Sequence, residues 1–170
     1  VARAHRVFCN RNLRVDRVAH IGFDMDYTLA IYNQREIDSL SIEVTARKLV
    51  DRGYPETLLG MPFRAEFPIR GLLVDRKQGN VLKMDRYKYV KLAYHGTRKL
   101  TMEERRRLYH TNRVRPAPKR YHWVDTLYAL SEVSVYAAVI DELERDGGEA
   151  IDYDRLFGDV RECIDVAHQD

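Results

Sequence analysis

The chain has 170 residues, of which 45% are hydrophobic and 32% charged, and its formal net charge is +3. This composition predicts a folded, soluble domain of ordinary size and argues against a uniformly basic surface. No apolar run approaches the ~20 residues of a membrane span, and Cys9 and Cys163 lack disulfide or metal-ligand spacing, so we expect a cytoplasmic protein without a membrane partner.

The first predicted element is a short buried strand over residues 18–23, an apolar run that ends directly before two aspartates. Asp24, Asp26 and Thr28 form a D-x-D-x-T motif. Open α/β sheets bind ligands at the carboxyl ends of their strands, so both carboxylates are candidates for one small site. One aspartate can attack phosphorus while the other protonates the leaving oxygen beside a cation. A turn or helix N-cap is the alternative, because Asp and Thr are common there.

The apolar pattern then predicts helices and a small sheet. A capping box supports one short helix, because Thr101 precedes Glu104 by three residues. The expected segments are helix 39–52, hairpin 72–84, strand 87–94, helix 102–109, a loop at 111–119, a helical stretch from Trp123 to the glycines at 147–148, and a last helix that Asp152 or Asp154 caps and that runs to His168.

The octet at residues 23–30 resembles the first signature of the haloacid-dehalogenase (HAD) phosphatases, and more closely that of the cytosolic purine 5′-nucleotidase family. The resemblance continues through several blocks in fixed order, which makes it much more specific than one motif. These blocks are F-C-N-R-N-L at 8–13, G-Y-P at 53–55, F-P-I-R-G-L at 67–72, G-N-V-L-K-M-D at 79–85 and F-G-D-V-R at 157–161, followed by Asp165 and His168.

The resemblance implies an α/β fold: a HAD-like, Rossmann-like core, incomplete in this chain, with inserted helical cap elements. Residues 1–95 would carry core elements with the nucleophile motif, and residues 96–170 a mostly helical, cap-associated segment for base recognition. It also implies that Asp24 is the nucleophile and Asp26 the acid/base. The Asp24 side chain and the Asp26 backbone carbonyl would hold Mg²⁺.

HAD phosphatases also use a Ser or Thr, a Lys and further acidic residues, which lie downstream in the family. This sequence opens on Val1 and stops at Asp170. We therefore expect an N-terminal portion of a longer enzyme.

The predicted last helix carries a second set of polar residues. Arg161, Asp165 and His168 are spaced i, i+4 and i+7, which places them on one face. The spacing alone favours an exposed ion pair, but the resemblance assigns the three residues to recognition of a purine base. It also implies that Tyr128 stacks on the base, with a core aromatic as the alternative. Asp125 lies where the family often has an asparagine that contacts nucleotide.

A basic segment precedes the second helical stretch. Arginines beside aromatic residues suit single-stranded nucleic acid, but Glu103 and Glu104 interrupt the cluster. We favour a solvated face or a subunit contact, so nucleic acid is not an expected partner. The segment comprises Arg105, Arg106, Arg107, Arg113, Arg115, Lys119 and Arg120 with Tyr109, Tyr121 and Trp123.

The sequence thus predicts hydrolysis of purine nucleoside 5′-monophosphates, such as IMP or GMP, through an aspartyl-phosphate. Two alternatives stay open: a HAD phosphatase for another phosphomonoester, and a non-catalytic module that binds nucleotide or nucleic acid. The resemblance also implies a homo-oligomer, since the family often forms oligomers.

Overall fold

A computed structural model describes residues 2–169, except 7, 9–13, 61–70, 111–112, 116, 118, 127, 146–149 and the side chain of Tyr128. The blocks at 8–13 and 67–72 and the glycines at 147–148 therefore lie mostly or wholly outside the described residues. The chain forms two compact units, Val1–Asn33 and Gln34–Asp170, and each is described by itself. Among the described residues, no helix has the length and apolar character needed to cross a membrane.

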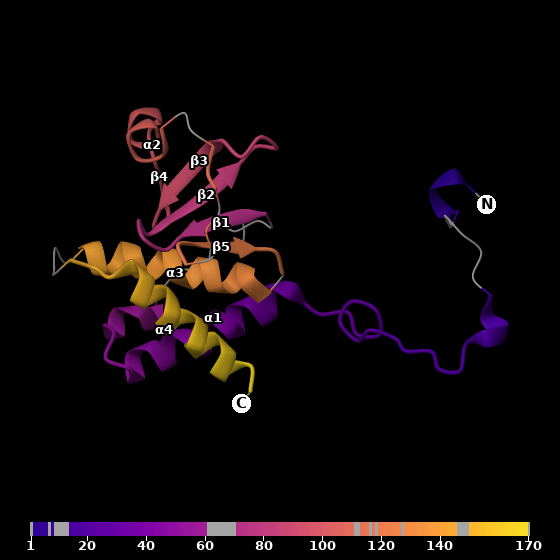
Figure 1. Ribbon diagram of the computed structural model, residues 1–170. Helices are drawn as coiled ribbons and strands as arrows, with labels where there is room; N and C mark the ends of the chain where they lie inside the picture. Colours follow the sequence, from indigo (N-terminus) through magenta and orange to yellow (C-terminus); the bar gives the residue numbers. More distant parts are fainter. Residues whose placement is uncertain are drawn as a thin grey trace. The chain divides into compact units, whose positions relative to one another are not determined.

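The second unit combines one antiparallel sheet with four helices, which confirms the α/β prediction (Figure 1). The sheet has the strand order β4-β3-β2-β1-β5, and every neighbouring pair is antiparallel. It is therefore not the parallel sheet of a Rossmann-like core. The strands are β1 (Leu72–Asp75), β2 (Asn80–Met84), β3 (Val90–His95), β4 (Arg98–Lys99) and β5 (Tyr121–Val124). The helices are α1 (Gln34–Asp51), α2 (Met102–Tyr109), α3 (Tyr128–Arg145) and α4 (Tyr153–Ala167).

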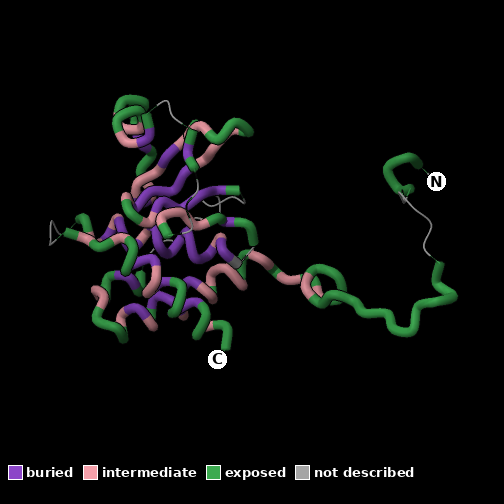
Figure 2. The backbone as a smooth tube through the Cα atoms, viewed as in Figure 1, coloured by how far each residue is buried: buried purple, intermediate pink, exposed green. Residues whose placement is uncertain are grey.

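Two apolar clusters cover the two faces of this sheet. On one face α3 packs against β2 and β5, and α1 and α4 pack against α3. On the other face α2 packs against β3, over a smaller cluster that includes Leu73 and Leu82. All four residues of β1 are buried, because both faces of this strand are covered (Figure 2).

Several sequence predictions are confirmed. The hairpin between β1 and β2 forms, and Gly79 adopts a left-handed φ of 64° in its turn. Helix α2 begins at the expected capping box, in which Thr101 and Glu104 exchange hydrogen bonds. Asp152, and not Asp154, caps α4, where its carboxylate accepts from two backbone N–H groups.

One prediction along this unit is wrong. Residues 121–124 form edge strand β5, whereas a helix was expected from Trp123. Trp123 pairs with Leu73 of β1, and the hydrogen bonds of this ladder satisfy the backbone groups of the segment. The segment is too short for its sequence to show the alternation of apolar and polar residues that indicates a strand. The expected division into residues 1–95 and 96–170 stays a prediction; the strands on either side of it, β3 and β4, pair with each other.

A buried carboxylate links three elements of this unit. Asp75, at the end of β1, is 0% exposed. It accepts hydrogen bonds from Arg120 Nε at 2.9 Å and Nη2 at 2.7 Å, and from the Tyr109 hydroxyl at 3.0 Å. The Asn80 amide donates to the Tyr109 hydroxyl at 2.8 Å. A buried charge needs such compensation, so these bonds fix the sheet against α2 and the segment before β5.

Candidate functional site

The D-x-D-x-T motif lies in a tight turn of the first unit. The Met25 carbonyl accepts from Leu29 N at 3.0 Å and Ala30 N at 2.9 Å, and Tyr27 N donates to the Ala30 carbonyl at 2.8 Å. Tyr27 itself adopts a left-handed φ of 58°. These bonds reverse the chain immediately after Asp24, so the motif is presented on a turn.

The two aspartates of the motif have different surroundings. Asp24 is exposed, whereas Asp26 is partly buried and accepts a hydrogen bond from the Tyr32 hydroxyl at 2.7 Å. The Tyr32 ring meets the Tyr27 ring edge-on, with 5.5 Å between centroids. Tyr32 therefore orients the Asp26 carboxylate and leaves Asp24 open to a ligand.

The buried strand predicted for residues 18–23 is wrong. These residues form no regular secondary structure and pair with no strand among the described residues, and Ile21 and Phe23 are each 70% exposed. A strand is stabilised by hydrogen bonds to a neighbouring strand, and an apolar pattern does not reveal whether that neighbour is present.

Helix α4 in the second unit positions the predicted base-recognition residues. Its buried face, centred on Phe157 and Val160, packs against the core, and Arg161 and Asp165 lie exposed outside this face. Arg161 Nε lies 3.7 Å from Glu132 Oε2 on α3, and Arg161 Nη1 donates to His122 Nδ1 on β5 at 3.3 Å. Arg161 is thus held between two elements far away in the sequence.

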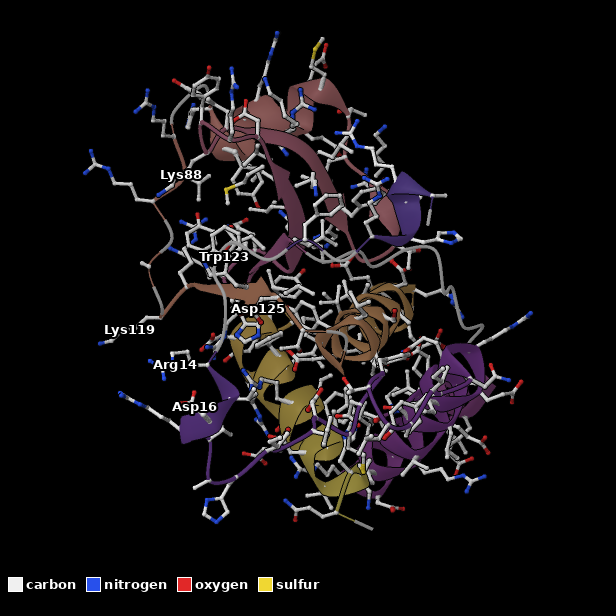
Figure 3. All side chains as sticks on the ribbon, turned by 90° about the vertical axis from the view of Figure 1, so that its right-hand side faces the viewer. Arg14, Asp16, Lys88, Lys119, Trp123 and Asp125 are labelled. Carbon is white, nitrogen blue, oxygen red and sulfur yellow. The ribbon has the colours of Figure 1, made fainter. Side chains whose placement is uncertain are left out.

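The remaining predicted residues lie near the helix ends. The His168 ring nitrogen Nδ1 lies 2.8 Å from the Ile164 carbonyl and donates to it, since a carbonyl only accepts. Asp125 is exposed just after β5 (Figure 3). Tyr128 begins α3, and its side chain is outside the described part of the chain.

Glu132 and His122 are functional candidates that the sequence analysis did not identify. Glu132 is 7% exposed, and its Oε1 atom has no hydrogen-bond partner among the described residues. Burial raises the pKa of Glu132 to about 7; Arg161 opposes the shift and Asp165 adds to it. Burial, and then Arg161, lower the pKa of His122. The sequence contained a signal for the burial of Glu132. It lies one helical turn before Tyr136 and two before Ile140, so it shares the apolar face of α3 with them.

The raised pKa of Glu132 predicts a pH-dependent stability. Between pH 4.5 and 7 the folded chain keeps a proton on Glu132 that the unfolded chain releases, so stability should fall as the pH rises, by about 3 kcal/mol. His122 acts in the opposite sense below pH 6.5, because its pKa is lowered on folding. The test is a series of thermal melts from pH 4.5 to 8. In Glu132→Gln, the decrease in melting temperature that Glu132 causes between pH 4.5 and 7 should be absent. Glu142→Gln, a buried glutamate on the same helix, is the control; an unchanged profile in Glu132→Gln would contradict the prediction.

The polar side chains of the two units suit different ligands. Asp24 and Asp26 offer hard oxygen ligands of the type that Mg²⁺ prefers, whereas Arg161 and Asp165 offer a donor and an acceptor for a planar polar ring. Across the described residues, no three His, Cys, Asp or Glu side chains gather closely enough to hold a metal ion. The two carboxylates of the turn would therefore need further ligands.

Comparisons with known proteins show similarity to 5′-nucleotidases. The model of the 5′ nucleotidase family matches residues 7–170. A 5′-nucleotidase domain-containing protein of Dictyostelium discoideum is 37% identical over 101 residues, which cover 58% of the chain and 17% of that protein. 5′-Nucleotidase domain-containing protein 2 of Homo sapiens and of Rattus norvegicus are each 29% identical over 95% of the chain. The chain spans 33% and 31% of their lengths, so it covers a third or less of these relatives.

Proposed function

Since the chain belongs to the 5′ nucleotidase family, we propose that it carries the nucleophile and the base-recognition residues of a purine nucleoside 5′-monophosphate hydrolase of the HAD type. The observation that supports this proposal most is the turn around the D-x-D-x-T motif. It exposes Asp24 and orients Asp26 through Tyr32. The family match supports nucleotide hydrolysis in general, and the motif supports the aspartate chemistry.

The proposed reaction has two steps. In the first, an Asp24 carboxylate oxygen attacks phosphorus in line, the bond between phosphorus and the 5′-oxygen breaks, and Asp26 gives its proton to that oxygen. In the second, Asp26 accepts a proton from water, the hydroxide attacks phosphorus, and the bond to Asp24 breaks to release phosphate. Mg²⁺, held by the Asp24 side chain and the Asp26 backbone carbonyl, would neutralise charge on the phosphoryl oxygens.

The base-recognition role rests on the residues around Arg161. Its guanidinium can donate to O6 or N7 of a purine, and the Asp165 carboxylate can accept from a ring N–H. Glu132 and His122 hold Arg161 in place and act as positioning residues. Tyr128 is proposed to stack on the base, and His168 and Asp125 to contact the nucleotide.

The first experiment is phosphate release from IMP and GMP, with and without Mg²⁺. It should compare this chain with the longer protein that the lengths of its relatives lead us to expect. Turnover by the longer protein supports the proposal. Nucleotide binding without turnover in both would favour the non-catalytic module.

Replacement of Arg161 tests the substrate class. We expect Arg161→Ala to raise KM for IMP and GMP by about 10- to 100-fold, because a hydrogen bond to a charged group contributes about 1.5–3 kcal/mol. Hydrolysis of p-nitrophenyl phosphate, which lacks a purine, should change little. Arg155→Ala removes an exposed arginine of the same helix and is the matched control. Equal losses on both substrates would instead favour a phosphatase for another phosphomonoester.

A further inference from the structure

A basic groove of about 890 Å³ opens beside the turn between β2 and β3. Among the described residues that line it, none is acidic. The chain as a whole is nearly balanced, with 29 Lys and Arg against 26 Asp and Glu, so this concentration of one charge sign is a local feature. Its charged and aromatic lining consists of Arg86, Lys88, Arg113 and Arg115 with Tyr87 and Tyr89.

Hydrogen bonds to backbone groups order the turn on one side of the groove and join it to the other side. The Asp85 carboxylate accepts from Tyr87 N at 2.8 Å and from Tyr89 N at 3.0 Å, which fixes the turn. On the other side, Val114 N donates to the Lys88 carbonyl at 2.9 Å. The groove is thus built by ordered backbone, and a ligand need not assemble it.

The cations of the groove keep their charge available for a ligand. Among the described residues, none of the four forms an ion pair with a carboxylate. Arg86 lies over the Tyr87 ring at 4.7 Å and donates to its hydroxyl at 2.6 Å, and Arg113 lies 6.0 Å from the centroid of the Tyr89 ring. Tyr87 is nevertheless 52% exposed. The groove therefore presents positive charge and an accessible aromatic ring together.

The surrounding sequence extends this charge. Residues 105–124 contain seven Lys and Arg, of which Arg120 is paired with Asp75, and no Asp or Glu; the other 150 residues carry 22 basic and 26 acidic side chains. Glu104, which precedes this segment, is engaged by Arg98 and caps α2. It does not line the groove and so does not interrupt its charge. Lys88 and Lys119 point to the same side of the second unit in Figure 3.

We propose that this groove binds single-stranded nucleic acid, with phosphates along the cations and a base on the exposed Tyr87 ring. Cations carried by two separate segments suit a chain of phosphates better than one phosphate group. Positive grooves with aromatic rings bind single strands in this way. None of these residues belongs to the set proposed for nucleotide hydrolysis, so the two proposals are tested independently.

The test is fluorescence anisotropy with a labelled oligouridylate of about 12 nucleotides, within the usual site size, at about 50 and 200 mM salt. We expect saturable binding that the double variant R113A/R115A weakens by about tenfold or more. For the double variant, the slope of log affinity against log salt should be less steep by about 1.4, since each lost phosphate contact contributes about 0.7 on a single strand. The matched control is R35A/R47A, which removes two exposed cations from α1 and should bind like the original.

Two further variants keep the test decisive if the double variant folds poorly. Lys88 has a left-handed φ of 69°, so Lys88→Asn removes a charge with a residue that tolerates this backbone. It should weaken binding several-fold, and Tyr87→Ala about tenfold. Equal binding by R113A/R115A and R35A/R47A would overturn the proposal. Displacement of RNA by equimolar inorganic tripolyphosphate, with no effect of Tyr87→Ala, would assign the groove to free oligophosphates instead.

Discussion

Replacement of Asp24 by asparagine is expected to lower the rate of phosphate release from IMP by about 10⁴-fold or more, when measured in the protein that shows turnover in the first experiment proposed above. An amide is a very poor nucleophile, so the proposed aspartyl-phosphate could not form, and loss of an enzyme's nucleophile commonly removes this much rate. The side chain is exposed, so the substitution should leave the melting temperature almost unchanged. Steady-state phosphate release and a thermal melt on the same preparation check both expectations.

Asp16→Asn is the matched control for this variant. Asp16 is another exposed aspartate of the first unit, where it pairs with Arg14 at 2.8 Å, and it has no proposed part in the reaction. Its replacement should leave turnover within about twofold of the original, because exposed ion pairs contribute little. An Asp24→Asn protein that keeps most of its activity would exclude Asp24 as the nucleophile.

The second large effect concerns stability. Asp75→Ala should lower the free energy of unfolding by about 3 kcal/mol, as measured by urea denaturation. It leaves the Arg120 guanidinium without its partner and removes the acceptor of the buried Tyr109 hydroxyl. We place the loss at the lower end of the usual range because the Arg120 side chain is 36% exposed and can turn toward water.

Glu43→Ala serves as the control for this measurement. It breaks the exposed pair between Glu43 and Arg47 on α1 and should cost less than about 0.5 kcal/mol. Asp75→Asn keeps an oxygen acceptor for Tyr109 and should therefore lose less than Asp75→Ala. A loss below about 1 kcal/mol in Asp75→Ala would show that the buried network does not hold the sheet.

Local signals predicted most elements of the second unit. Thr101 and Glu104 fixed the start of α2, because a capping box is decided by residues three positions apart. The glycine-containing hairpin turn and the cap of α4 at Asp152 were also predictable, since each depends on a few neighbouring residues. The motif around Asp24 and the family blocks indicated the proposed chemistry without any structural information.

Pairing and burial were decided only by the tertiary structure. The apolar run at 18–23 satisfies the pattern of a strand yet pairs with no strand among the described residues, whereas 121–124 becomes a strand because β1 pairs with it. The Asp75 network and the contacts of Arg161 with Glu132 and His122 join residues from distant segments. Sequence spacing specifies local conformation and the face of a helix on which a residue lies. Sequence spacing does not specify which distant side chains contact that residue, and such contacts determine the burial and pKa of Glu132.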